Sequence, residues 1–258
     1  MRIITFCADG IQDAADRGFY EWVSSQDADF VCVQNLGAQE YELQADIFFP
    51  KDYNSYFFDS VKSNSNGVAI YSRELPKAIM TGLGFNESDM EGRYMQADFD
   101  NISIGSLLAP SAIDNSPEEQ LKKTAFFEQF RSHLDKVKNK RREFIICGNW
   151  NIAHSAKDIE DTAKASGQSG FLPEERQWMD EIFGLGYVDA FREINSDSDE
   201  FTWWPDGTRE KPQDSNGWRV DYQIVSQGMK YTVEYGAAYK RQSFSNHAPL
   251  TMDYDFEL

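Results

Sequence analysis

Short apolar runs bounded by turn residues recur along the whole chain, and this pattern constrains the fold more than any other feature of the sequence. Each run is about four to seven residues long, a length that favours strands over helices. The predicted strands cover residues 2–7, 30–34, 68–72, 94–99, 102–108, 144–147, 220–225, 231–237 and 250–254.

Helical spacing appears between some of these runs. We predict one helix over about residues 13–25, a second that begins at Ser116-Pro117 and a third that begins at Pro173, because proline is favoured in the first turn of a helix. The apolar side chains of the second helix are Leu121, Phe126 or Phe127, Phe130, Leu134 and Val137. Strands outnumber helices and lie near both ends of the chain, so we expect two packed sheets with helices outside, an α/β sandwich. Because no repeat or linker interrupts residues 1–258, we expect a single domain.

The charge balance limits the partners of the chain. Its formal net charge of −18 at pH 7 argues against a protein that coats nucleic acid nonspecifically, since such binding requires Lys and Arg to neutralise phosphates. No apolar run approaches the roughly 20 residues of a membrane-spanning helix. Residues 1–10 lack the pattern of a leader peptide. The three cysteines lie far apart in apolar surroundings, which predicts reduced, buried thiols in a cytoplasmic protein.

One local exception to the negative charge lies after the second predicted helix. It is a basic cluster made of Lys136, Lys138, Lys140, Arg141 and Arg142, followed by Glu143. Cations at this place suit the negative end of the helix dipole, and a solvated helix end is the simplest interpretation. The alternative is a contact surface for RNA phosphates or for a partner protein, in which Glu143 pairs with a partner cation.

Polar residues at the ends of predicted strands are the candidates for a functional site. They include two carboxylates, four amides and one imidazole: Asp9, Asp221, Asn35, Asn149, Asn151, Asn246 and His247. One or two carboxylates are enough for a Mg²⁺ site that also uses substrate phosphates. Amides cannot accept a proton near neutral pH, and each Asn alone is most simply a turn or cap residue. From residue types alone this is a polar pocket with few catalytic groups.

The same segments resemble the exonuclease III and abasic-site endonuclease branch of the endonuclease/exonuclease/phosphatase superfamily, over nearly the whole chain. The resemblance is carried by Gly67-Val68-Ala69-Ile70-Tyr71-Ser72, Glu91-Gly92-Arg93-Tyr94, Gly170-Phe171-Leu172-Pro173-Glu174-Glu175-Arg176, Val188-Asp189-Ala190-Phe191-Arg192, Thr202-Trp203-Trp204 and Gly217-Trp218-Arg219-Val220-Asp221-Tyr222. It implies a four-layer α/β/β/α sandwich of two mixed sheets flanked by helices, with the active cleft at one edge.

The chain departs from that family's pattern at several positions of the cleft. Where the family has Asn, Glu, Tyr, Asp and Asp, this chain has Cys7, Asn35, Leu108, Asn149 and Asn246. The resemblance implies that these changes remove a metal ligand, a water-activating carboxylate and the anionic partner of His247. On this basis we expect an eroded cleft without catalytic residues, and Asp9 and Asp221 as weak residual candidates for a metal.

Zinc is not expected from the sequence. His154 is not spaced like a zinc ligand, and no cluster of Cys and His residues is visible along the chain. The resemblance therefore implies a protein without a cofactor, unless Mg²⁺ binding survives.

A nuclease-like chain eroded in this way is similar to the catabolite repression control (Crc) proteins. The likeness includes Arg141-Arg142-Glu143, Gly82-Leu83-Gly84-Phe85, Gln96-Ala97-Asp98-Phe99-Asp100 and Asn246-His247-Ala248-Pro249-Leu250. It implies an inactive relative of the nucleases that represses translation together with Hfq on A-rich RNA and binds little RNA or DNA alone. The alternative is a Mg²⁺-dependent exodeoxyribonuclease III or abasic-site endonuclease whose reorganised site uses Asp9, Asp221 and His247.

Overall fold

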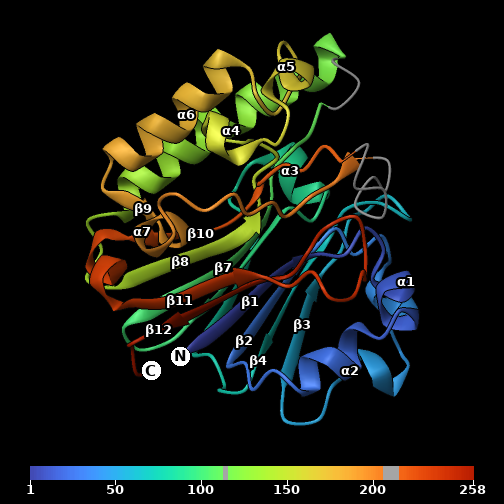
Figure 1. Ribbon diagram of the computed structural model, residues 1–258. Coiled ribbons are helices and arrows are strands. Elements are labelled where there is room, and N and C mark those ends of the chain that lie inside the picture. Colours follow the sequence, from blue (N-terminus) through green and yellow to red (C-terminus); the bar gives the residue numbers. More distant parts are fainter. Residues whose placement is uncertain (113–115, 206–214) are drawn as a thin grey trace.

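Two six-stranded sheets face each other in the computed structural model, which describes residues 1–112, 116–205 and 215–258 (Figure 1). The first contains β1 (Arg2–Cys7), β2 (Phe30–Gln34), β3 (Asn54–Phe58), β4 (Val68–Ser72), β11 (Val233–Ala238) and β12 (Leu250–Tyr254). The second contains β5 (Ala78–Thr81), β6 (Tyr94–Asp98), β7 (Ile102–Leu108), β8 (Glu143–Asn149), β9 (Tyr187–Asp189) and β10 (Asp221–Ser226). The strand orders are β11-β12-β1-β2-β4-β3 and β5-β6-β7-β8-β10-β9, and both sheets mix parallel and antiparallel pairs.

The helices are α1 (Ile11–Asp16), α2 (Phe19–Ser24), α3 (Asn86–Met90), α4 (Pro117–Val137), α5 (Thr162–Ala165), α6 (Pro173–Gly184) and α7 (Ala190–Ile194). Helices α1, α2, α4 and α6 cover the outer faces of the two sheets (Figure 1), whereas α7 packs between β10 and β11 with Phe191 in the core between the sheets. Phe19 of α2 packs with Phe6 of β1 on one outer face. Phe130 of α4 and Ile182 of α6 share a buried cluster with Ile146 of β8 on the other. The predicted α/β/β/α sandwich is confirmed.

The core between the sheets is apolar and contains two of the three cysteines. Cys32 of β2 and Cys147 of β8 are fully buried in the same cluster as Ile3 and Ile145. All three cysteines are free and buried, as the sequence predicts. Burial on both faces explains why the central strands appear in the sequence as continuous apolar runs.

Local differences from the predicted elements have simple causes. The helix expected over residues 13–25 is two short helices, α1 and α2, because Gly18 between them adopts a left-handed φ of 87°. Leu121, expected in the buried stripe of α4, is 70% exposed, whereas Phe126 and Phe130 are buried. None of the helices in the described ranges is both long and apolar enough to cross a membrane.

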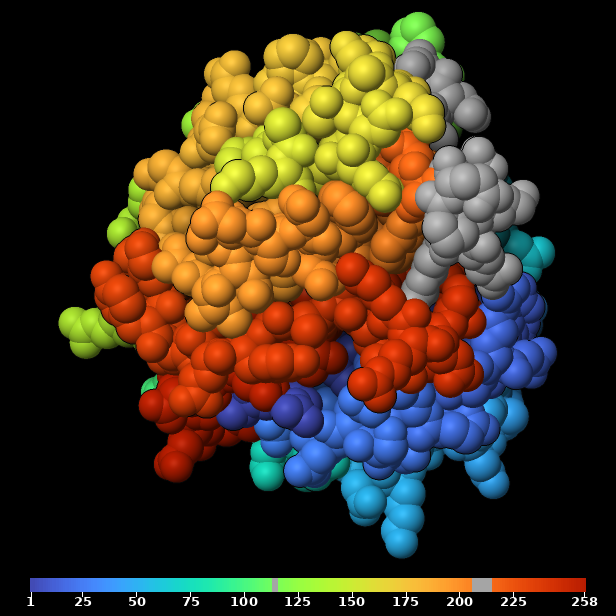
Figure 2. Space-filling view, viewed as in Figure 1, coloured from blue at the N-terminus to red at the C-terminus, as the bar shows by residue number. Residues whose placement is uncertain are grey.

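The two ends of the chain lie side by side. β12 pairs with β1 antiparallel, with Thr5 opposite Leu250, and the N-terminal and C-terminal segments adjoin on the face seen in Figure 2. Because Leu250 is close in sequence to His247, this pairing places His247 near Cys7, where β1 ends.

The same end of the sandwich collects the ends of several other strands. Cys7 lies opposite Gln34 of β2 in a parallel pair, while Asn149 of β8 lies opposite both Leu108 of β7 and Asp221 of β10. The polar residues that follow or begin these strands therefore gather at one edge.

Candidate functional site

A cleft of about 280 Å³ opens at this edge. Most of the residues predicted from the sequence line it: Asp9, Asn35, Leu108, Asn149, Asn151, Asn246 and His247. Cys7 and Asp221 are 1% and 0% exposed and lie directly behind the lining, in contact with His247, Asp9 or Asn149. The structure thus brings all of the predicted cleft residues together.

The lining also includes six residues that were not predicted to belong to the cleft: Asn66, Arg93, Ala109, Ser111, Trp203 and Pro205. Asn66 has a left-handed φ of 51° and precedes Gly67, with φ of 88°, at the start of β4. An Asn-Gly pair signals a tight turn. Its position beside a strand end was the signal that could have placed Asn66 at the cleft.

His247 and Asp221 form a buried pair at the base of the cleft. Asp221 Oδ2 lies 2.7 Å from His247 Nδ1, and both side chains are almost fully buried. The expectation that Asn246 leaves His247 without an anionic partner is therefore wrong, because Asp221 from β10 supplies the carboxylate. The partners are separated in sequence and meet only because the two sheets are packed face to face.

The pair holds His247 in one orientation and one charge state. Burial by itself would lower the pKa of His247, but the negative charge of Asp221, together with that of Asp9, raises it well above its ordinary value. The backbone N–H of His247 donates to Ser245 Oγ, whose hydroxyl donates to the carbonyl of Cys7. These contacts anchor the loop before β12 to the end of β1.

Cys7, Asp9 and His247 form a compact group. One ligand atom from each lies within 4.8 Å of the others, with Cys7 Sγ 3.6 Å from Asp9 Oδ1 and His247 Nε2 3.9 Å from Asp9 Oδ2. Burial raises the pKa of the Cys7 thiol to about 11 in the metal-free protein. The expectation that no Cys–His cluster exists was wrong, because the pairing of β1 with β12 joins residues from opposite ends of the sequence.

Mg²⁺ is the ion that the family resemblance implies, and it prefers oxygen ligands in octahedral geometry. Asp9 is the one carboxylate among the described residues that line the cleft. Asn35 turns its amide nitrogen, not its oxygen, toward Asp9, and this nitrogen donates to Asp9 Oδ1 over 2.8 Å. The remaining candidates are a thiol and an imidazole nitrogen. This donor set does not fit Mg²⁺.

The amides on the opposite wall are held by internal hydrogen bonds. Asn149 Oδ1 accepts from the backbone N–H of Asn151, and Asn149 Nδ2 donates to Cys7 Sγ over 3.6 Å. Asn151, with a φ of 53°, donates its side-chain amide to the carbonyl of Ala109. The wall is therefore fixed in place before any substrate arrives.

The tryptophans near the cleft serve mainly as its frame. Trp218 and Trp204 are 3% and 5% exposed, so neither offers a face to a base. Trp203 lines the cleft and stacks on His247, with ring centroids 6.0 Å apart and an interplanar angle of 29°. Of the three, Trp203 alone is placed to contact a substrate.

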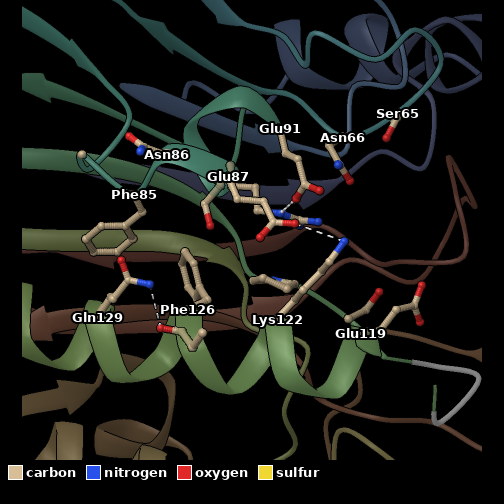
Figure 3. A pocket seen from close by; sticks show the side chains of 16 residues that line it. Ser65, Asn66, Phe85, Asn86, Glu87, Glu91, Glu119, Lys122, Phe126 and Gln129 are labelled. Carbon is tan, nitrogen blue, oxygen red and sulfur yellow. Dashed lines mark hydrogen bonds and ion pairs between the residues drawn. The ribbon is translucent and has the colours of Figure 1, made fainter. Parts of the chain in front are cut away.

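A second hollow of about 550 Å³ adjoins the cleft and shares Asn66, Arg93 and Ser111 with it. It lies between the segment around α3 and the start of α4 (Figure 3). Lys122 pairs with Glu87 across it at 3.1 Å, and Arg93 pairs with Glu91. The hollow has three carboxylates, Glu87, Glu91 and Glu119, and two cations, Arg93 and Lys122. Its lining therefore does not favour binding of the phosphates of a nucleic-acid backbone.

The basic cluster predicted from the sequence lies away from the cleft. Glu143 begins β8 and Asn149 ends it, so about 20 Å of strand separates them. Arg142 is paired with Asp98 at 3.0 Å and donates to the carbonyl of Phe99. Glu143 accepts from Ser226 Oγ, and Lys138 pairs with Asp135 at 2.7 Å. Within the described ranges, the cluster members without an ion pair are Lys136, Lys140 and Arg141.

The chain matches known proteins along most of its length. Residues 12–237 match the model of the Endonuclease/Exonuclease/phosphatase family. The exodeoxyribonuclease of Bacillus subtilis is 27% identical and covers 98% of each chain. The DNA repair nuclease APEX1 of Danio rerio is 28% identical over 98% of this chain and 81% of its own length. An AP endonuclease structure from Archaeoglobus fulgidus, with 24% identity, covers 99% of this chain and all of its own, at a TM-score of 0.88.

These relatives correct one expectation. The prediction of a catalytically inactive protein is contradicted, because the relatives that match nearly the whole chain carry the names of nucleases. One of its three premises, an unpartnered His247, also fails, since Asp221 completes the pair. The comparisons do not single out the Crc proteins. The chain belongs to the endonuclease/exonuclease/phosphatase family and is similar to its exonuclease III and AP endonuclease members.

Proposed function

We propose that this protein hydrolyses phosphate esters of DNA, as an exodeoxyribonuclease or abasic-site endonuclease, in the cleft built around His247. The observation that carries the proposal is the buried 2.7 Å contact between His247 Nδ1 and Asp221 Oδ2, which directs Nε2 toward the side of Asp9. A carboxylate that fixes the tautomer and orientation of a histidine is a recurring requirement of hydrolytic sites.

Each group has a defined task in this reaction. His247, held in its charged form by the surrounding anions, stabilises the negative charge that develops on a phosphate oxygen. Asp9, with 31% of its side-chain surface exposed, orients the attacking water and accepts its proton. Trp203 stacks on the imidazole and limits its movement.

The charge of the protein favours a substrate that needs few phosphate contacts. The net charge of −18 repels the backbone of a long duplex, and the hollow beside the cleft carries more carboxylates than cations. The end of a DNA strand, or a single damaged nucleotide, can be bound by contacts within the cleft alone. This argues for local recognition of a scissile phosphate rather than extended binding along DNA.

The direct test is cleavage of two end-labelled duplexes, one with a single abasic site and one with a recessed 3′ end, in the presence of a panel of divalent ions. We expect product from at least one duplex with the wild-type protein and a loss of about 10⁴ in turnover for His247→Gln. Lys140→Glu, at the far end of β8, is the matched control and retains full activity. Failure to cleave either duplex with any ion would overturn the proposal.

A second proposal concerns the basic cluster and does not depend on the state of the cleft. Lys136, Lys140 and Arg141 are exposed and have no ion-pair partner in the described part of the chain. This favours a contact between the cluster and A-rich RNA held by Hfq, as the resemblance to Crc proteins implies. Little binding to RNA alone is expected at this net charge.

The variant for this second proposal reverses Lys140 and Arg141 and leaves Arg142 intact, because Arg142 has a structural role with Asp98. The double reversal should remove the ternary complex in a gel-shift assay while the melting temperature stays unchanged. A ternary complex that the double variant still forms at moderate salt would contradict this proposal and leave the cluster as a solvated helix end. Lys51→Glu combined with Lys62→Glu, at two exposed lysines outside the cluster, makes the same change in net charge and serves as the control.

A further inference from the structure

We propose that Cys7, Asp9 and His247 form a binding site for a borderline-soft divalent ion such as Zn²⁺. Their ligand atoms lie within 4.8 Å of one another. Zinc binds sulfur, nitrogen and carboxylate oxygen at about 2.0–2.3 Å, which places ligand atoms roughly 3.3–3.8 Å apart in a tetrahedron. Cys7 Sγ lies 3.6 Å from Asp9 Oδ1, and His247 Nε2 lies 3.9 Å from the other oxygen of that carboxylate, Oδ2, so both neighbours approach Asp9 at close to this spacing.

The groups behind the three ligands also suit a metal site. A metal-binding histidine usually donates its other ring N–H to a carboxylate, which fixes the ring and increases its basicity. His247 has this partner in Asp221, at 2.7 Å from Nδ1. Asn149 donates to Cys7 Sγ, and Asn35 donates to Asp9 Oδ1. Each proposed ligand is thus oriented by a named neighbour.

The position of the group corresponds to an open rather than a closed zinc site. Cys7 is 1% exposed, whereas Asp9 and His247 line the cleft. Three protein ligands would leave a fourth position that faces the cleft, as in catalytic zinc sites. The ion would take the place of the proton on His247 Nε2, because a histidine ligand must be neutral, so the ion and not the imidazolium would then supply the positive charge in the cleft. The cleft itself provides the path by which an ion enters.

The surroundings of Cys7 differ from those of the other two cysteines. A buried cysteine commonly acts as a small apolar side chain, and Cys32 and Cys147 fit that description within the core between the sheets. Cys7 instead has a carboxylate and an amide within hydrogen-bond range of its sulfur. A thiol in this polar setting matches the preference of Zn²⁺ for mixed sulfur and nitrogen ligands. The same thiol is a reason why the site does not suit Mg²⁺.

The test uses Co²⁺ as a spectroscopic substitute for zinc in the full-length protein after treatment with a chelator. We expect one equivalent of Co²⁺ to produce a thiolate-to-metal charge-transfer band in the near ultraviolet and visible bands of four-coordinate intensity. Zn²⁺ should remove these bands, whereas an excess of Mg²⁺ of about 100-fold should not. This readout does not require DNA cleavage, so the ion site and the proposed function can fail separately.

Single substitutions show which residues bind the Co²⁺ that gives the charge-transfer band. Cys7→Ser should abolish the charge-transfer band, and Asp9→Asn should keep it while weakening Zn²⁺ binding at least about tenfold. Cys32→Ala, which removes a different buried thiol, is the matched control and should retain both the band and the affinity. Asp9→Asn, at an exposed position, keeps the test valid if Cys7→Ser fails to fold.

Either of two results would overturn the proposal. One is a wild-type protein that gives no thiolate band at stoichiometric Co²⁺. The other is a band that Cys32→Ala removes and Cys7→Ser leaves unchanged, which would place the ion between the core thiols instead.

Discussion

Lys123 Nζ lies 2.8 Å from Glu175 Oε1, and the two side chains are 1% and 0% exposed. The pair joins α4 to α6, and Nζ also donates to the carbonyl of Asn151 in the wall of the cleft. Burial lowers the pKa of Lys123, although the charge of Glu175 opposes that effect. This contact connects the outer helical layer to the candidate site.

Removing one member of the pair should be costly. We expect Lys123→Met to lower the free energy of unfolding by about 3–5 kcal/mol, because Glu175 would remain as an uncompensated buried charge. Chemical denaturation measures this loss. Adding Glu175→Gln should restore part of it, since the amide keeps an acceptor oxygen for the N–H of Gly170 and carries no charge. A double variant no more stable than Lys123→Met would contradict this explanation.

The pair of His247 and Asp221 can be tested against another His–Asp pair in the same chain. Asp221→Asn should reduce DNA cleavage by about 10⁴, because it removes the negative charge that orients His247 and holds it in its charged form. His154 Nε2 lies 2.7 Å from Asp180 Oδ1 outside the cleft. Asp180→Asn therefore makes the same chemical change and should leave the rate unchanged. Equal losses in both variants would argue against a special role for Asp221.

Stability should fall at acidic pH through a buried network at Asp158. Burial alone would raise the pKa of Asp158, but Arg219 and Arg192, at 2.7 and 2.6 Å, hold it well below the usual value. A carboxylate with a lowered pKa in the folded state contributes stability above its unfolded pKa of about 3.9, and that contribution is lost as the pH falls below it. Denaturation at a series of pH values should show this decline, and Asp158→Asn should flatten it.

Restoring the family's carboxylates should change the ion that the cleft accepts. Asn35→Glu, Asn149→Asp and Asn246→Asp together would place new negative charges around Asp9, since Asn35 and Asn149 already contact Asp9 or Cys7. Crowded carboxylates repel one another, so the metal-free triple variant should melt at a lower temperature than the wild type. Mg²⁺ should raise its melting temperature and leave that of the wild type unchanged. An unchanged melting temperature without metal would mean that the three side chains do not converge.

The central strands could be predicted from the sequence, and the edge strands largely could not. Four strands, β1, β2, β4 and β7, begin and end at the predicted residues, and each is buried along nearly its whole length. The bounds of β12 also match, and there the buried side chains alternate with partly exposed ones. β3, β5 and β9 were not predicted. Each lies at the edge of a sheet, and the side chains of β5 are mostly exposed, so these segments lack that pattern.

The composition of the cleft could be predicted, but its internal contacts could not. Strand ends and the family resemblance indicate which residues lie there. The pairing of His247 with Asp221, and the approach of Cys7 to His247, depend on tertiary packing between segments far apart in the sequence. The expectation of an inactive site rested on Asn35, Asn149 and Asn246, and the contact of His247 with Asp221, which removes the argument from Asn246, is visible only in the folded chain.

The position of the basic cluster at the far end of β8 has a practical consequence for single-molecule and surface experiments. All three cysteines of the chain are buried and no more than 1% exposed, so Lys140→Cys would introduce the one solvent-accessible thiol. A fluorophore or surface tether attached there would lie about 20 Å of strand away from the cleft. The molecule could then be immobilised in a single orientation with its cleft facing the solution.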